Sequence, residues 1–216
     1  MNSLAQTPSA TVSRPRRTRF TGWSTIASGV ALLIVGQKAY FPPSVGLVLL
    51  LATLAFYLGM IPVARWIARG LAERDNGDRV RVIRAAEIAS VAGAAIAALT
   101  AILALPHWLS AVPAQILDTS ALGVIGLWLV VSSVLAFRAR LYNRALAIIG
   151  ALAGVSWLLA AIIMWIELIA GNLGSLVSAI ETVRLLGGYL GSAFYLIWAM
   201  WLGIWLLIRK RQPSQE

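Results

Sequence analysis

Long runs of hydrophobic residues, separated by short polar segments, extend through most of the 216 residues of the chain. A helix needs about 20 apolar residues to cross the roughly 30 Å hydrocarbon core of a bilayer. Six runs reach that length: Phe20–Phe41, Ser44–Ala68, Ala85–Pro106, Thr119–Phe137, Ala145–Ala170 and Leu185–Ile208. The pattern predicts an all-α, polytopic membrane protein whose six transmembrane helices form one bundle.

The predicted bundle covers residues 20–208, and the segments on either side of it are polar. Residues 1–19 are rich in Ser, Thr, Pro and Arg and are predicted to form a disordered, basic cytoplasmic tail. Residues 209–216 are predicted to form a second, short cytoplasmic tail. Between the last two apolar runs, Asn172–Val183 has apolar residues at helical spacing, which predicts a short amphipathic helix in the outer membrane interface.

The distribution of basic residues predicts the orientation of the bundle. Lys and Arg in short loops remain on the cytoplasmic side of a membrane. The two tails and the second-to-third and fourth-to-fifth connections hold 16 of the 18 basic residues, whereas the opposite side holds only Lys38 and Arg184. Six spans with both termini in the cytoplasm fit every connection, and five or seven spans do not.

The composition excludes a soluble globular domain. Hydrophobic residues make up 60% of the chain and charged residues 12%, compared with roughly 45–50% and about 25% in soluble domains. A net charge of +10 would suggest a nucleic-acid partner in a soluble protein. Here the basic residues alternate with apolar runs instead of forming one patch, so no nucleic-acid partner is expected.

Few residues in the chain can carry out catalysis or hold a metal. There is no cysteine, and His107 is the single histidine, which excludes disulfides, thiolate metal sites and multi-histidine metal sites. No Gly-x-Ser-x-Gly, His-Glu-x-x-His or phosphate-binding glycine loop occurs. We therefore predict no metal and no cofactor, and the sequence favours a non-enzymatic protein.

The basic residues also suggest where the protein resides and which lipids it meets. Arginine outnumbers lysine by 16 to 2 and alanine is abundant, which indicates a GC-rich bacterium and hence its plasma membrane. Anionic lipids of the inner leaflet attract basic residues that flank transmembrane helices. Five arginines around the second-to-third connection are predicted to contact these headgroups: Arg65, Arg69, Arg79, Arg81 and Arg84.

Ionisable residues on the opposite side form a second candidate site, made of Lys38, His107, Asp118, Glu167 and Arg184. Glu167 lies deepest in its apolar run, where a charge is costly unless Lys38 or Arg184 pairs with it. We hypothesise a shallow outward-facing pocket with Glu167 at its floor, for a ligand or a proton. The alternative is that these are ordinary interfacial charges held by water.

Small residues at helical spacing predict where helices pack closely. Small side chains let neighbouring helices approach, which matters where lipid removes the hydrophobic drive between them. The predicted packing positions are Gly93, Gly150, Gly154, Gly187 and Gly191. The alternative is that glycine is merely common in this chain. Similar faces could also receive a second copy of the chain or a partner membrane protein.

Two segments resemble a known family. The first runs from Pro62-Val-Ala-Arg65 to Arg84-Ala-Ala-Glu87, a basic hairpin followed by an Arg-x-x-Glu helix start. The second is the basic loop and helix start of 138–150, from Arg138-Ala-Arg to Ile-Ile-Gly150. Both are similar to segments of the DUF4386-like group of uncharacterised six-span bacterial membrane proteins. The resemblance implies a fold and a topology, and no activity.

Three functions remain open on the sequence alone. The first is non-enzymatic binding or transport of a small molecule or a lipid, because an apolar bundle with few buried charges lacks reaction chemistry. The second is a structural or regulatory membrane subunit that recognises a partner protein through its small-residue helix faces and basic hairpin. The third, a membrane enzyme acting on lipid, is disfavoured by the scarcity of His, Asp and Cys.

Overall fold

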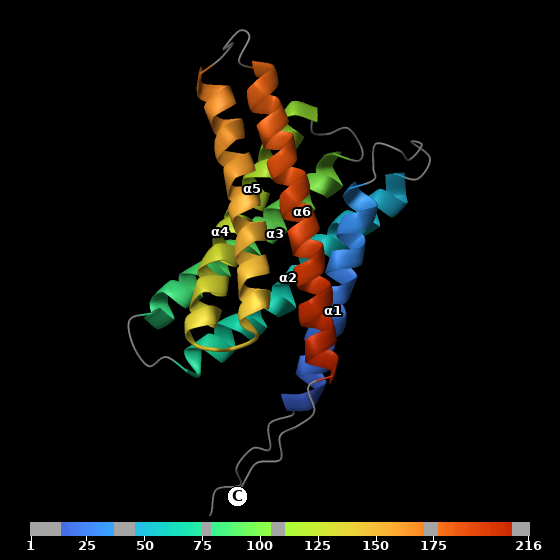
Figure 1. Ribbon diagram of the computed structural model, residues 1–216. Helices are drawn as coiled ribbons and strands as arrows, with labels where there is room; N and C mark the ends of the chain where they lie inside the picture. The colour runs from blue at the N-terminus through green and yellow to red at the C-terminus, as the bar shows by residue number, and fades with distance from the viewer. Residues whose placement is uncertain (1–13, 37–45, 75–78, 105–110, 171–176, 209–216) are drawn as a thin grey trace, which may run out of the picture.

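The structure, a computed structural model, describes residues 14–36, 46–74, 79–104, 111–170 and 177–208. In these residues the chain forms helices and no strand, which confirms the all-α prediction (Figure 1). The helices are α1 (Arg14–Gly36), α2 (Gly46–Ala72), α3 (Arg79–Ala104), α4 (Ala111–Arg138), α5 (Arg144–Ala170) and α6 (Val177–Ile208).

The helices are arranged in a closed ring that follows their order in the chain. Each helix packs against its neighbours in sequence, and α1 packs against α6 to close the ring. A smaller contact joins α2 to α4. Because successive helices run in opposite directions, the starts of α1, α3 and α5 and the ends of α2, α4 and α6 all lie at one end of the molecule (Figure 1).

Five of the helices, α2 to α6, are long and apolar enough to cross a membrane by length and composition. The length and the apolar composition of these helices are those of a multi-pass membrane protein. The remaining helix, α1, carries buried hydroxyl groups on Thr21, Thr25 and Ser28. These polar side chains are buried, and together with the arginines in the first six residues they lower the mean hydropathy of α1.

Hydroxyl groups of α1 bind it to its two neighbours in the ring. Ser24 Oγ donates a hydrogen bond to Gly59 O at 2.9 Å, and Ser28 Oγ donates one to Phe56 O at 3.0 Å. The hydroxyl of Tyr195, on α6, lies 2.7 Å from Ser28 Oγ. Since the single proton of Ser28 is directed to Phe56 O, Tyr195 is the donor in this pair. Hydrogen bonds between helices of this kind stabilise membrane bundles.

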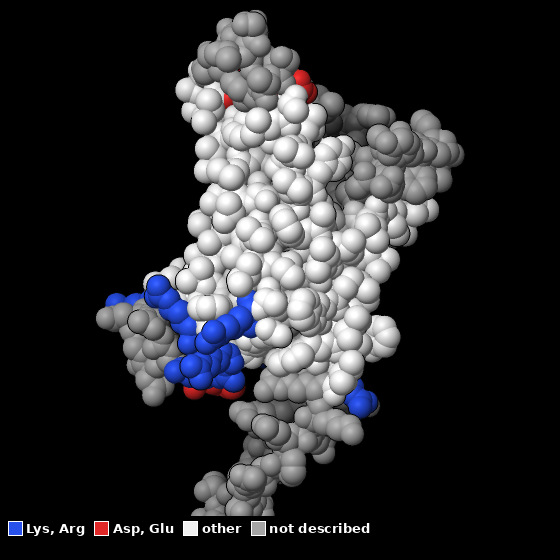
Figure 2. Space-filling model, viewed as in Figure 1, with Lys and Arg blue, Asp and Glu red and all other residues white. Residues whose placement is uncertain are grey.

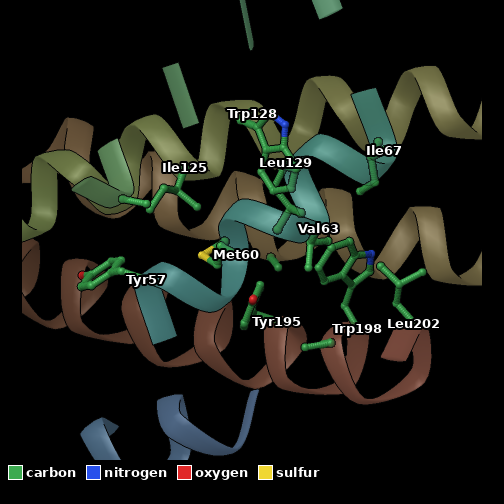
Figure 3. Close-up of a cluster of buried hydrophobic side chains, with 14 of the residues drawn as sticks. Tyr57, Met60, Val63, Ile67, Ile125, Trp128, Leu129, Tyr195, Trp198 and Leu202 are labelled. Carbon is green, nitrogen blue, oxygen red and sulfur yellow. The ribbon is translucent and has the colours of Figure 1, made fainter. Parts of the chain in front are cut away.

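Aromatic side chains fill the centre of the ring. Phe56 of α2 lies 6.1 Å from Trp157 of α5 and 5.6 Å from Tyr195 of α6, measured between ring centroids. Tyr195 in turn lies 5.7 Å from Trp198. Residues of α2 and α4, among them Met60 and Leu129, complete this core (Figure 3). The described residues therefore form a packed interior, with edge-to-face and tilted ring pairs typical of aromatic packing.

The glycines predicted at packing positions lie in contacts between neighbouring helices. A Cβ atom would lie 3.4 Å from Val124 at Gly93 and 3.2 Å from Ser156 O at Gly187, and would meet Gly126 O at Gly154 and Trp157 at Gly191. Gly93 thus packs on α4, Gly154 also packs on α4, and the two glycines of α6 pack on α5. Side chains at these positions would hold the helices apart.

Four helices, α1, α3, α4 and α6, begin several residues before their predicted starts, because an apolar run marks only the part of a helix that lipid would cover. α1 begins at Arg14, so residues 14–19 are helical and not part of a disordered tail. α3 begins at Arg79, six residues before the predicted start. α4 begins at Ala111, eight residues before the predicted start, with Pro113 in its first turn, where proline is tolerated. Residues 1–13 and 209–216, the rest of the predicted tails, lie outside the described residues.

The predicted amphipathic helix at 172–183 is wrong as a separate element. Residues 177–183 form the first turns of α6, which continues without interruption to Ile208. Residues 171–176 lie outside the described part of the chain. The apolar spacing in this segment reflects the extension of α6 and does not mark a helix that lies along the interface.

Candidate functional site

Exposed arginines gather at the end of the bundle where α2 and α4 end and α3 and α5 begin (Figure 2). We call this end the arginine end. Of the residues predicted to contact lipid headgroups, Arg79 begins α3 here, and the side chains of Arg65, Arg69, Arg81 and Arg84 are exposed. The other exposed arginines of this end are Arg19, Arg74, Arg138, Arg140 and Arg144.

On α2 and α3 these arginines continue the outward-facing sides of the helices. The exposed side chains of Leu51 and Leu58 on α2 are seven residues apart, and Arg65 follows after seven more. On α3, Ile88 is 68% exposed, and Arg84 lies four residues before it. Residues four or seven apart lie on the same face of a helix. On these two helices, an arginine therefore lies at the arginine end of each outward-facing apolar surface.

The same arrangement holds on α4 and α5. Val134 is exposed on α4, and Arg138 follows four residues later. Ile148 is exposed on α5, and Arg144 precedes it by four residues. All four of these helices thus carry an arginine at the end of an outward apolar face.

The two connections at the arginine end are held together. Arg74 Nη1, after α2, donates a hydrogen bond of 3.0 Å to Ala139 O, after α4. Leu141, in the α4–α5 connection, packs on Gly70 of α2, where a Cβ atom would lie 2.8 Å from Leu141 Cδ1. These contacts fix the arginines of one connection relative to those of the other.

The α4–α5 connection is a tight turn with an unusual backbone. Leu141 N donates to Ala136 O at 3.0 Å and Arg140 N donates to Phe137 O at 3.3 Å, the paired bonds of a Schellman motif. In this motif the residue in the position of Arg140 has a left-handed conformation and is usually glycine. Arg140 has a φ of 49° and is the non-glycine residue with positive φ in the described chain.

The side chain of Asn143 ends the turn by capping α5. Its Oδ1 accepts a hydrogen bond of 3.1 Å from Ala145 N, and its main-chain oxygen accepts one from Ala147 N. Asparagine is a preferred residue at this position because its short side chain satisfies a free helical N–H group.

A buried polar cluster lies directly beneath this turn. The hydroxyl of Tyr142 lies near the hydroxyl of Ser133 and the indole N–H of Trp198, although none of the three makes a well-aligned hydrogen bond. Burial raises the pKa of Tyr142 to about 12, and its two polar neighbours lower this pKa in part. Gly150 makes room for the cluster, since a Cβ atom there would lie 2.6 Å from Ser133 Oγ.

A cavity of about 10 Å³ lies between α2, α3 and α4 toward the arginine end. This volume is at the lower limit for a single water molecule, so the cavity is too small for an organic ligand. It is lined by Ile67, Ala68, Leu71, Ile83, Ala86, Trp128, Val131, Ser132 and Leu135.

The opposite end of the bundle carries an ion-pair cluster between α5 and α6. Arg184 Nε lies 3.3 Å from Glu167 Oε2, and Arg184 Nη2 lies 3.7 Å from Glu181 Oε1. The side chain of Glu167 is 25% exposed and that of Arg184 is 14% exposed. Glu167 Oε1 is buried without a hydrogen-bond partner. Arg184 is thus one of the two cations that the sequence suggested for Glu167.

Asp118, predicted in the same site, has a different partner. It is half-buried on α4 and accepts a hydrogen bond from the hydroxyl of Tyr57, which is buried on α2. Lys38 and His107 lie outside the described residues. Among the described residues, no group of three or more His, Asp or Glu side chains could hold a metal ion.

Sequence reasoning treated several of these residues differently. From the sequence, Arg138, Arg140 and Arg144 were predicted to orient the protein and not to form a site, although the three arginines lie within seven residues. Tyr57 carried no signal, because its contact with Asp118 depends on how α2 and α4 meet.

No protein-family model, curated protein or solved structure matches this chain.

Proposed function

We propose that this protein is a six-span integral protein of a bacterial plasma membrane that binds anionic lipids of the inner leaflet. The observation that carries the proposal is the position of the exposed arginines at the polar ends of the outward apolar faces of α2, α3, α4 and α5. Lipid tails cover such faces, so a residue at their end lies at the level of the headgroups.

In this proposal α1 is the sixth span. Its apolar part, residues 20–36, has 17 residues, which is the lower end of the length range for transmembrane helices. From residue 20 onward the exposed side chains of α1 are apolar, including Val30 and Leu33, and its hydroxyl groups bond to α2 and α6 instead of facing lipid. Both termini then lie on the side of the arginine end, which the excess of basic residues assigns to the cytoplasm.

Fusions of a phosphatase that is active only in the periplasm test this topology. Fusions after residue 76 or residue 141, in the two arginine-rich connections, should be inactive. A fusion after residue 42, between the first two predicted spans, should be active. Activity after residue 76 or 141 would show that the orientation is wrong.

Lipid binding is tested on the purified full chain. Each arginine near an anionic surface contributes about 1 kcal/mol of attraction. Replacement of Arg65, Arg69, Arg79, Arg81 and Arg84 with glutamine should therefore sharply lower binding to phosphatidylglycerol relative to phosphatidylcholine in vesicles. The variant Arg19→Gln is a single-charge reference on α1. An unchanged lipid preference in the five-residue variant would contradict the proposal.

The packed interior supports binding at the surface of the bundle over passage through its centre. Phe56, Trp157, Tyr195 and Trp198 occupy the middle of the ring, and each is at most 2% exposed. We therefore place the lipid on the outward faces and at the arginine end. The resemblance of the two basic segments to the DUF4386-like group agrees with this topology and adds no activity.

A second candidate function is ligand or proton binding at Glu167. The buried, unpartnered Oε1 of Glu167 is the observation that favours it, since an acceptor buried without a partner is costly and a ligand or proton could satisfy it. Glu167→Gln keeps the shape of the side chain and removes its charge. If Glu167 carries this role, the variant should reproduce any phenotype that deletion of the gene produces, while protein abundance stays unchanged. A normal phenotype in the variant would rule out this role.

A further inference from the structure

The strongest unexplained feature at the arginine end is the conformation of Arg140. A φ of 49° is readily adopted by glycine and disfavoured for a residue with a Cβ atom. Strained positions of this kind persist at functional sites, where a particular side chain is required. Arg140 is exposed, so its guanidinium group makes no buried contact that would account for the strain.

Arginines on both sides of Arg140 have restrained guanidinium groups. The guanidinium carbon of Arg144 lies 5.7 Å from the centroid of the Phe137 ring, a cation–π distance. Arg74 Nη1 is held by Ala139 O. A guanidinium group has five N–H donors, so Arg74 keeps donors for a further acceptor. Restrained donors lose less conformational freedom when they bind a ligand.

We propose that Arg74, Arg138, Arg140 and Arg144 form a specific site for the phosphate group of an anionic phospholipid. The proposal rests on the proposed function and narrows it to one place and one chemical group. Guanidinium groups match phosphate oxygens in geometry and charge. The lipid is favoured as the source of the phosphate because Arg138 and Arg144 continue the outward apolar faces of α4 and α5, along which the acyl chains would lie.

Binding at this site differs from general attraction to a charged surface. General attraction depends on the number of charges and little on which arginine supplies them. A specific site depends on Arg140 more than on an arginine elsewhere at the same end. Arg19, on α1, is exposed at this end, and α1 packs chiefly against α2 and α6. It is therefore the matched control.

The test uses the full chain in detergent, with bound lipids counted by native mass spectrometry and thermal unfolding measured in parallel. The probes are phosphatidylglycerol and phosphatidylcholine. Arg140→Gly should lower the affinity for phosphatidylglycerol about twentyfold, because it removes hydrogen bonds to a charged phosphate, whereas general attraction gives about fivefold at most for one arginine. The same variant should unfold at the same temperature or a higher one, because glycine relieves the backbone strain. Loss of binding with gain of stability cannot come from misfolding.

Two further variants separate charge from backbone. Arg140→Asn tolerates the left-handed conformation and lacks the charge, so it should lose binding as Arg140→Gly does. Arg19→Gln removes one charge from the same end and should change the affinity much less. If Arg19→Gln lowers binding as much as Arg140→Gly, the turn site is wrong and general attraction remains. If no arginine variant, including the five-residue variant, changes binding, the proposed function is also wrong.

Unfolding temperatures measured with different phosphate compounds identify the source of the phosphate. Inorganic phosphate alone should not raise the unfolding temperature, whereas phosphatidylglycerol should. An equal effect of inorganic phosphate would assign the site to a soluble anion and overturn the lipid proposal. Binding of a polyglutamate peptide in place of lipid, lost in Arg140→Gly, would likewise overturn it in favour of an acidic protein partner.

Discussion

The contact between Gly126 and Gly154 allows a sharp test of how the bundle is held together. α4 and α5 form the most extensive helix pair of the ring. A Cβ atom at Gly154 would meet Gly126 O and would lie 2.9 Å from the main-chain nitrogen of Val130. Both atoms belong to the backbone of α4 and cannot rotate away as a side chain can. We therefore expect Gly154→Ala to push α5 away from α4.

The magnitude follows from two opposing effects. Alanine favours the helix over glycine by about 1 kcal/mol. Overpacking of a close contact costs about 1–3 kcal/mol. Because the obstructing atoms are backbone atoms, the cost should lie near the upper limit. Gly154→Ala should then reduce the free energy of unfolding by about 1–2 kcal/mol.

Gly188 provides the matched control for this substitution. It lies on α6, and a Cβ atom there would meet no atom within 4 Å. Gly188→Ala should therefore stabilise the protein by about 0.5–1 kcal/mol through helix propensity alone. Thermal unfolding of both variants in the same detergent measures the difference. If Gly154→Ala is as stable as the wild type, the close backbone contact between α4 and α5 does not exist.

Three further predictions concern buried hydroxyl groups. A double-mutant cycle of Ser28→Ala and Tyr195→Phe, followed by unfolding in detergent, should give a coupling energy of about 1 kcal/mol, and additive effects would contradict the hydrogen bond between them. Burial raises the pKa of Tyr142 from 10 to about 12, so the unfolded state loses the phenol proton at lower pH than the folded state does. The stability that this difference provides is complete below pH 10 and declines between pH 10 and pH 12. The decline is about 1.4 kcal/mol per pH unit. Unfolding measured in that range should depend less steeply on pH in Tyr142→Phe, and an identical slope would refute the burial of this phenol. Tyr57→Phe should destabilise the protein by about 1 kcal/mol because it removes a donor from the carboxylate of Asp118, and Asp118→Asn should cost less, since an amide oxygen also accepts.

The length of the apolar runs was enough to predict that the helices exist, because the free energy of placing a helix in lipid is dominated by its consecutive apolar residues. The predicted and observed starts of α5 differ by one residue, Ala145 against Arg144. The starts of α1, α3, α4 and α6 were predicted too late, because a helix continues into polar residues as long as its backbone hydrogen bonds are satisfied. Apolarity alone carries no information about that continuation.

The partners of the ionisable residues could be predicted only in part. Arg184 was one of two cations suggested for Glu167, and the α5–α6 contact brings them together. The pairing of Tyr57 with Asp118 could not be foreseen, because it joins α2 and α4, which are separated in the chain by α3. Such a contact depends on the curvature of the ring, and no local pattern encodes it.

The arginines of the α4–α5 connection show that membrane orientation and ligand binding require different things of a sequence. Orientation in a membrane depends on the number of basic residues in a short loop and hardly on which loop position each occupies. An arginine moved to a relaxed position, with glycine in the left-handed one, would orient the protein equally well. Arg140 instead occupies the position with a φ of 49°. A contact that depends on where its guanidinium group lies accounts for that placement, whereas orientation alone does not.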